Sequence, residues 1–241
     1  MKNRTLGYLL VNFFFPPRCA LCGQILEDQR SDLPCPSCRE RISPIFRPLC
    51  PGCGVPFQAP GDDHFCSACL TENRFFSMAR AIGIYEGWIA ETLSRFKYHG
   101  ASHLAVPLGN LMAECEDPDL FWSVMDTLIP VPLHPHRLRE RGFNQSLLLA
   151  RQISRRHSIP VDFLTLERIR MTVPQVDLSG AERKKNLQGA FRVRKKENIR
   201  QKHILLVDDV FTTGTTVGEC SKVLLQAGAK QVDVITCARA R

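Results

Sequence analysis

Two adjacent carboxylates and a group of hydroxyls near the C-terminus have the types and spacing needed for chemistry on a sugar phosphate. Asp208 and Asp209 follow the apolar run 204–207, which is typical of a strand buried on both faces of a parallel sheet. Four threonines then surround one glycine at the start of an amphipathic helix: Thr212, Thr213, Gly214, Thr215 and Thr216.

Backbone N–H groups and the dipole at the start of such a helix attract phosphate. Carboxylates at the end of a strand accept hydrogen bonds from sugar hydroxyls or help to hold a metal. The alternative is a threonine-capped helix beside two solvated aspartates. Because strand, acidic pair, glycine turn and helix occur in working order, the pattern favours a sugar-phosphate site.

The run 204–216 closely resembles the phosphoribosyl pyrophosphate (PRPP) binding motif of type I phosphoribosyltransferases. The resemblance implies that Asp208 and Asp209, as the catalytic pair, contact the ribose 2′- and 3′-hydroxyls of PRPP. It also implies that residues 212–216 surround the 5′-phosphate and that magnesium accompanies PRPP.

A cluster of arginines within residues 132–145 is a second candidate element of the site. Arg137, Arg139 and Arg141 are closely spaced and precede Gly-Phe-Asn-Gln, which opens a helix. Guanidinium groups and helix-terminal N–H groups together suit a pyrophosphate, whereas the alternative is a solvated basic face. The residues assigned here to the PRPP phosphates are Arg137, Arg141 and Asn144.

Residues 168–190 form the third candidate element, a polar connection of about twenty residues within a compact domain. We predict a mobile flap that closes over a charged substrate and excludes water, with Arg183 contacting phosphate. An ordinary mobile surface loop is the alternative.

Eight of the eleven cysteines form a tandem repeat near the N-terminus, in which each unit reads C-x-x-C-G, twelve residues, C-x-x-C. Shifting the sequence by 31 residues superimposes the first unit on the second. Each unit supplies the four thiolates of a tetrahedral metal site, so the repeat predicts two structural zinc ions. Sequential pairing gives Cys19, Cys22, Cys35 and Cys38 for one ion and Cys50, Cys53, Cys66 and Cys69 for the other; an interleaved pairing remains open.

A disulfide scaffold is the alternative for these cysteines, and it would require an oxidising compartment. The first 15 residues superficially resemble a signal peptide, but no small-residue cleavage site follows them. Their apolar residues instead follow the spacing of a core-facing helix, and no apolar run is long enough to span a membrane. We therefore expect a cytoplasmic protein with reduced thiols and no membrane span.

Positive charge is concentrated in the C-terminal part of the chain. The formal net charge is +8 over 241 residues, and residues 76–241 hold 24 basic and 17 acidic side chains, a net +7. Eight thiolates and two zinc ions would reduce the total to about +4. The excess suits a polyphosphate ligand or a nucleic acid.

The chain is long enough for one α/β domain and one small metal-held domain. We predict residues 1–74 as an N-terminal helix with a double zinc ribbon, and residues 75–241 as a phosphoribosyltransferase-type domain with a mostly parallel sheet flanked by helices. Expected strands are 79–85, 127–131, 161–166, 203–208 and 231–236, with helices at 88–96, 104–112, 147–156 and 215–227. Only five residues follow the last expected strand, so an acceptor pocket would come from residues 79–116, where Lys97, Tyr98 and His99 are candidates.

The chain as a whole resembles the ComF family, including its GntX-like members, which join a double zinc ribbon to a phosphoribosyltransferase-like domain. The resemblance rests on the eight cysteines and on residues 129–132, 141–145 and 207–216, with further matches at Gln175, Arg183, Asn186 and 189–191. It implies a role in competence, DNA uptake or use of DNA. It also implies possible partners in single-stranded DNA and in the helicase and other proteins of the DNA-uptake machinery.

Two functional hypotheses follow. In the first, the protein is a PRPP- and magnesium-dependent phosphoribosyltransferase in which an amine or base attacks the anomeric carbon. In the second, it is a non-catalytic single-stranded-DNA-binding module whose transferase fold is a PRPP sensor or a relic. Aromatic residues among the ribbons, Phe46, Phe57 and Phe65, could stack on bases.

Overall fold

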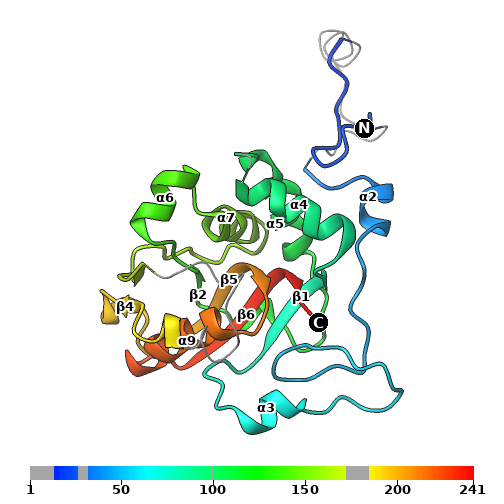
Figure 1. The fold of residues 1–241 in the computed structure, drawn as a ribbon. Helices are drawn as coiled ribbons and strands as arrows, with labels where there is room; N and C mark the ends of the chain where they lie inside the picture. Colours follow the sequence, from blue (N-terminus) through cyan, green and yellow to red (C-terminus); the bar gives the residue numbers. More distant parts are fainter. Residues whose placement is uncertain (1–13, 27–31, 99, 172–184) are drawn as a thin grey trace.

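A computed structural model describes residues 14–26, 32–98, 100–171 and 185–241 (Figure 1). The strands are β1 (Ala79–Ile84), β2 (Thr127–Pro130), β3 (Leu166–Arg168), β4 (Phe191–Val193), β5 (His203–Phe211) and β6 (Gln231–Arg239). The helices are α2 (Pro36–Glu40), α3 (Ser67–Thr71), α4 (Gly87–Tyr98), α5 (Ala105–Ala113), α6 (Pro135–Arg141), α7 (Gln145–His157) and α9 (Thr215–Gln226). Short 3₁₀ segments lie at Ser102–Leu104, Trp122–Val124 and Lys196–Asn198.

Four strands form a parallel sheet in the order β1-β6-β5-β2, which confirms the predicted fold class. Strands β5 and β6 lie at its centre, and the residues of β5 from Ile204 to Val207 are fully buried. Such continuous apolar runs are what a sheet covered on both faces requires.

Helices cover both faces of the sheet (Figure 1). Leu205 and Val207 belong to the apolar cluster that contains α4, α5 and α7, whereas Ile204 and Leu206 belong to the cluster that contains α9. Successive side chains of a strand point to opposite faces, so one apolar run serves two cores. The helices expected at 88–96, 104–112, 147–156 and 215–227 are all present, with small differences at their ends.

The strand expected at 161–166 is wrong. Val161 makes only an isolated bridge to Leu128. The Asp162 side chain accepts hydrogen bonds from the backbone N–H groups of Leu164 and Thr165 at 3.1 and 3.0 Å, which turns the chain away from the sheet. The regular strand is β3, which starts at the last residue of the expected one and pairs antiparallel with β4.

Most of the polar connection predicted at 168–190 lies outside the described residues, which resume at residue 185. Strands β3 and β4 flank this connection and pair as an antiparallel hairpin, which no pattern in the sequence predicts. Each strand has only three residues, too few for a clear alternating pattern.

Candidate phosphate site and metal centres

The threonine-rich loop connects the carboxyl end of β5 to the first turn of α9. Gly214 is the N-cap residue in the left-handed region, at φ 78°, and no side chain caps the helix. A Cβ at this position would lie 2.6 Å from Cζ of Phe211, so the loop requires glycine. The Thr213 and Thr215 hydroxyls hydrogen-bond to each other at 2.7 Å. This loop has the form of a phosphate site at the start of a twelve-residue helix.

The two predicted carboxylates lie just beyond the end of β2 but within β5, which continues to Phe211 rather than ending at residue 208 as expected; the two have different partners. Asp209 pairs with Nζ of Lys97 from α4 at 3.0 Å. Asp208 accepts hydrogen bonds through Oδ1 from the Ser146 hydroxyl and from its neighbour's backbone N–H, both at 2.9 Å. Three elements separated in sequence, α4, α7 and β5, therefore meet at the acidic pair.

Burial and neighbouring charges shift the pKa values of the groups at the acidic pair. Burial and the charge of Asp209 raise the pKa of Asp208 to about 7, although Lys97 and the Ser146 hydroxyl act in the opposite direction. Burial also lowers the pKa of Lys97, but the nearby carboxylates outweigh it, so the net shift is upward. A pair of carboxylates held this way is suited to receive hydrogen-bond donors or a cation.

Arg137 and Arg141 lie four residues apart on α6, and both lie close enough to Arg168 to repel its charge. The guanidinium of Arg141 stacks over the Tyr98 ring at 5.3 Å, and Arg137 makes a long ion pair with Glu140 at 3.8 Å. The predicted basic segment is therefore a short helix that faces the end of the sheet.

Asn144 has a structural role that explains its place in the Gly-Phe-Asn-Gln sequence. Its side-chain oxygen accepts from the backbone N–H of Leu147 at 3.4 Å and caps α7, and its amide donates to the carbonyl of Val131 at 3.1 Å. Gly142 ends α6 in the left-handed conformation, at φ 79°. The cap fixes the start of α7, which places Ser146 against Asp208.

The hairpin β3–β4 contributes Arg168 to the same region. Burial lowers the pKa of Arg168, while the charge of Asp208 raises it, so the two groups interact. Arg170 donates to the carbonyls of Asn186 and Gln188 at 2.9 and 2.7 Å, which ties the two ends of the connection together. Arg183 and Gln175 lie outside the described residues.

Two residues at this site were not assigned to it from the sequence. Ser146 directly follows the Gly-Phe-Asn-Gln run, and this adjacency was the available signal. The sequence suggests Lys97 only as a candidate for an acceptor pocket. It lies more than 100 residues before Asp209, and no local pattern links the two.

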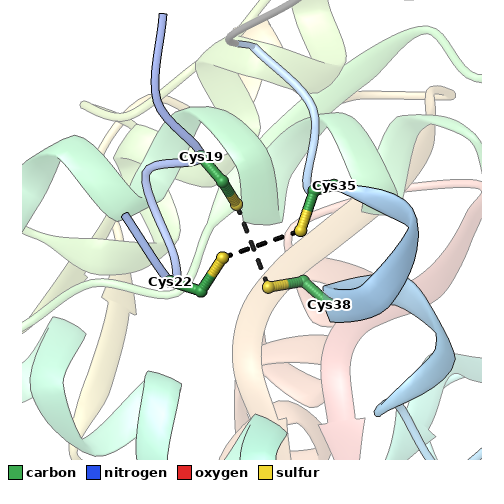
Figure 2. A group of neighbouring side chains, drawn as sticks. All are labelled: Cys19, Cys22, Cys35 and Cys38. Carbon is green, nitrogen blue, oxygen red and sulfur yellow. Dashed lines mark hydrogen bonds between the residues drawn. The ribbon is translucent and has the colours of Figure 1, made fainter. Parts of the chain in front are cut away.

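The eight repeat cysteines form two compact groups, each drawn from one unit as sequential pairing has it. Within each group the four sulfurs lie within 4.8 Å of one another; Figure 2 shows the first group converging on one point. Sulfur separations of 3.9 Å (Cys19–Cys38), 3.6 Å (Cys22–Cys35) and 3.7 Å (Cys53–Cys66) match the edge of about 3.8 Å expected for four thiolates 2.3 Å from zinc. A disulfide would require about 2.05 Å. These are the two four-cysteine sites of a double zinc ribbon.

The first cysteine of each unit has a lowered pKa. Burial raises the pKa of Cys50, but backbone N–H groups at Cys53 and Cys66 outweigh it and bring the pKa to about 6. The same balance brings the pKa of Cys19 to about 7. Because the thiolate is the form that binds metal, Cys19 and Cys50 are suited to bind zinc at neutral pH, whereas burial raises the pKa of Cys38 and Cys69.

Comparisons with known proteins agree with this two-part architecture. Residues 10–70 match the double zinc ribbon domain, and residues 144–241 match the phosphoribosyl transferase domain. The chain is 31% identical to Competence protein F of Haemophilus influenzae over 239 residues, which cover 94% of this chain and 99% of that protein. The chain belongs to the ComF family.

DNA utilization protein YhgH of Escherichia coli K12 is a further relative of this ComF family protein. The two are 32% identical over 222 residues, which cover 91% of this chain and 95% of that protein. Among solved structures, the glutamine PRPP amidotransferase from B. subtilis matches with 23% identity and a TM-score of 0.36, covering 53% of this chain and 25% of that one. In the described part of the chain, none of the helices has the length and apolarity that crossing a bilayer requires.

Proposed function

We propose that this ComF family protein binds PRPP at the carboxyl end of β5. The observation that carries the proposal is the convergence of an acidic pair, a glycine-threonine loop at a helix start and arginines from two other elements. In this arrangement the loop 212–216 holds the 5′-phosphate, and Asp208 and Asp209 accept hydrogen bonds from the ribose hydroxyls. Lys97 holds Asp209 in place through the 3.0 Å ion pair.

The arginines serve the pyrophosphate in this proposal. Arg137 and Arg141 present two positive charges from α6, Arg168 adds a third from β3, and Arg183 belongs to the segment between the hairpin strands. Asn144 contributes by fixing the start of α7, because both ends of its side chain are engaged within the fold.

Magnesium fits the same site because the acidic pair offers carboxylate oxygens, the ligand type that this ion prefers. When bound with PRPP, the ion would neutralise part of the pyrophosphate charge. The residues themselves position the sugar and stabilise the leaving group. In a transfer reaction, the lone pair of an amine or base would form the new bond to the anomeric carbon, and pyrophosphate would leave with the electrons of the broken C–O bond.

We further propose that this activity supports DNA uptake or the use of DNA, in the cytoplasm and beside the helicase and other proteins of the uptake machinery. Two relatives carry the names Competence protein F and DNA utilization protein. The cytoplasmic assignment is supported by the cysteines, all eleven of which lie in the described residues and are free of disulfides.

Titration calorimetry with PRPP and magnesium tests the proposal. Asp208→Asn combined with Asp209→Asn removes two charged acceptors, each worth about 1.5–3 kcal/mol, so affinity should fall by at least tenfold. Thr213→Val should have a smaller effect because it removes one hydroxyl. Asp126→Asn, at the opposite end of the sheet, is the matched control. Unchanged affinity in the double variant would exclude this site for PRPP.

Single-stranded DNA binding is a second candidate function, favoured by the ribbon aromatics. Phe46 is 71% exposed and Phe65 is 51% exposed, whereas Phe57 stacks on His64 at 3.8 Å and is less available. Fluorescence anisotropy with a labelled oligonucleotide should show binding that weakens by about 0.7 log unit per log unit of salt for each phosphate neutralised. Phe46→Ala with Phe65→Ala should weaken binding if the ribbons stack on bases. PRPP should compete only if the arginines of α6 also contact DNA.

A further inference from the structure

Arg74 lies between the second ribbon and the phosphate loop. It belongs to the segment that leads from α3 into β1, and its Nη1 lies 3.0 Å from the position that a Cβ would take on Gly214. Its guanidinium stacks over the Phe76 ring at 5.6 Å, and Phe76 meets Phe211 edge to face at 5.9 Å. The arginine is thus held by aromatic rings against the turn that starts α9.

The positive charge of Arg74 is not matched by an acidic partner. Among the residues that the structure describes, Arg74 makes no ion pair, and its buried Nε has no hydrogen-bond partner. A buried guanidinium nitrogen of this kind is costly unless a ligand or water satisfies it. The position beside Gly214 would bring Arg74 close to an anion held by the loop.

Arg239 provides an informative contrast. Its guanidinium lies 4.9 Å from the Phe211 ring and donates a hydrogen bond to the carbonyl of Cys53, although its Nε also has no hydrogen-bond partner among the described residues. This hydrogen bond directs the Arg239 guanidinium to the second four-cysteine group. Of these two arginines, Arg74 is the one with a nitrogen 3.0 Å from the Cβ position of Gly214 in the phosphate loop.

We propose that Arg74 is a phosphate-binding residue that the ribbon side of the molecule supplies to the 5′-phosphate subsite. This inference rests on the proposed function, because it assigns a further ligand to the same PRPP site. It goes beyond that function by making phosphate affinity depend on the segment that follows the second four-cysteine group. Arg74 and Arg239 together connect that group to the loop through Phe76 and Phe211.

The test measures affinities for PRPP, ribose 5-phosphate and inorganic pyrophosphate in the full chain and in Arg74→Ala and Arg74→Lys. Arg74→Ala removes one charge-assisted hydrogen bond to the 5′-phosphate. The affinities for PRPP and ribose 5-phosphate should therefore fall by the same factor, about 10- to 100-fold, and the affinity for pyrophosphate should not change. Arg74→Lys should be intermediate, because it keeps the charge but not the planar fork. Lys222→Ala is the control, since it removes a nearby charge on α9 that stacks on Phe75 instead.

The zinc content and unfolding midpoint of each variant show that the ribbon and the sheet remain folded. Unchanged ribose 5-phosphate affinity in a folded Arg74→Ala variant would overturn the role of Arg74 while the PRPP site stands. A lower affinity for pyrophosphate together with an unchanged affinity for ribose 5-phosphate would overturn the assignment of Arg74 to the 5′-phosphate. If the unmodified protein binds neither PRPP nor ribose 5-phosphate, the proposed function itself fails.

Discussion

The two cysteine units match at a spacing of 31 residues, yet they join opposite faces of the same sheet. Three cysteines of the first unit pack in the cluster of α4, α5 and α7, whereas Cys50 and Cys53 of the second pack in the cluster of α9. In Figure 1, α2 of the first unit and α3 of the second accordingly lie far apart.

The contacts of the two units differ in kind as well as in place. Side chains tie the first unit to the helices: Arg95 and Asn110 donate to the carbonyls of Leu21 and Asp32 at 3.3 and 2.8 Å. The second unit bonds to strands instead: the Ala79 N–H donates to the Gly52 carbonyl at 2.8 Å, and the side chains of Arg80 and Arg239 donate to the carbonyls of Pro51 and Cys53. The same repeat sequence therefore attaches to helices on one face of the sheet and bonds to edge strand β1 in its second copy.

Removing the metal groups one at a time tests this difference most strongly. A structural zinc contributes on the order of 10 kcal/mol to folding, which is comparable to the whole stability of a domain. Cys50→Ser with Cys53→Ser should unfold the second ribbon, disturb β1 and abolish PRPP binding. Cys19→Ser with Cys22→Ser should unfold the first ribbon and keep one zinc and PRPP binding. Native mass spectrometry and calorimetry decide this, and equal loss in both variants would contradict the comparison.

The arginines that connect each unit to the sheet should differ in importance. Arg80 of β1 is buried, bonds to Asp119 at 2.7 Å and donates to the Pro51 carbonyl of the second unit at 3.0 Å. Arg80→Ala should lower the free energy of unfolding by about 3 kcal/mol, because the largely buried Asp117 loses its nearest cation, which lies at 3.0 Å. Arg39 of the first unit pairs with Glu114 near the surface, so Arg39→Ala should cost less than about 1 kcal/mol. Denaturant titrations measure both, and similar losses would argue against the difference in contacts.

The glycines that follow the second cysteine of each unit form a matched pair. Both have positive φ, 76° at Gly23 and 70° at Gly54, so alanine strains each by about 1–2 kcal/mol. A Cβ at Gly54 would also lie 2.6 Å from the carbonyl oxygen of Ala79, whereas Gly23 has nothing within 4 Å. Gly54→Ala should therefore destabilise by about 3 kcal/mol in total and Gly23→Ala by about 1. Thermal unfolding would contradict the prediction if the two variants behaved alike.

The pH dependence of stability should report on Asp208, which lies in β5 between the two faces of the sheet. The raised pKa of Asp208 means that its ionised form is disfavoured in the folded state. Stability without PRPP should therefore fall as the pH rises from about 4 through about 7, by about 2 kcal/mol after allowance for partial exposure. Asp208→Asn should remove this loss and raise stability at pH 8. Denaturant unfolding at pH 5 and pH 8 checks the sign, and the same pH slope in both proteins would exclude Asp208 as its source.

Asp119 serves as the control, because its contribution to stability depends on pH in the opposite direction to that of Asp208. Hydrogen bonds from Arg47 and Arg80 lower the pKa of Asp119. Its contribution is present above its ordinary pKa and is lost as the pH falls through the lowered value. Asp119→Asn should therefore change only the acid side of the stability profile and leave the slope between pH 5 and pH 8 intact.

Much of the fold could be predicted because its signals are local. The apolar run 204–207, the glycine and threonines of the loop and the cysteine spacing each lie within a few tens of residues. The strand expected at 161–166 failed for a reason that is also local. Asp162 competes for backbone N–H groups through its side chain, and this turn chemistry outweighs the β propensity of its apolar neighbours.

The sequence by itself determined the two four-cysteine units, the parallel sheet and the acidic pair followed by a phosphate loop, because each depends on spacing along the chain. Only the tertiary structure decided that the two units lie on opposite faces, that Lys97 reaches Asp209 and that Arg74 rests against Gly214. These contacts join residues about 110 to 140 positions apart, and packing of the sheet creates them. No spacing pattern encodes them, because the path of the chain between the partners can vary without changing either local sequence.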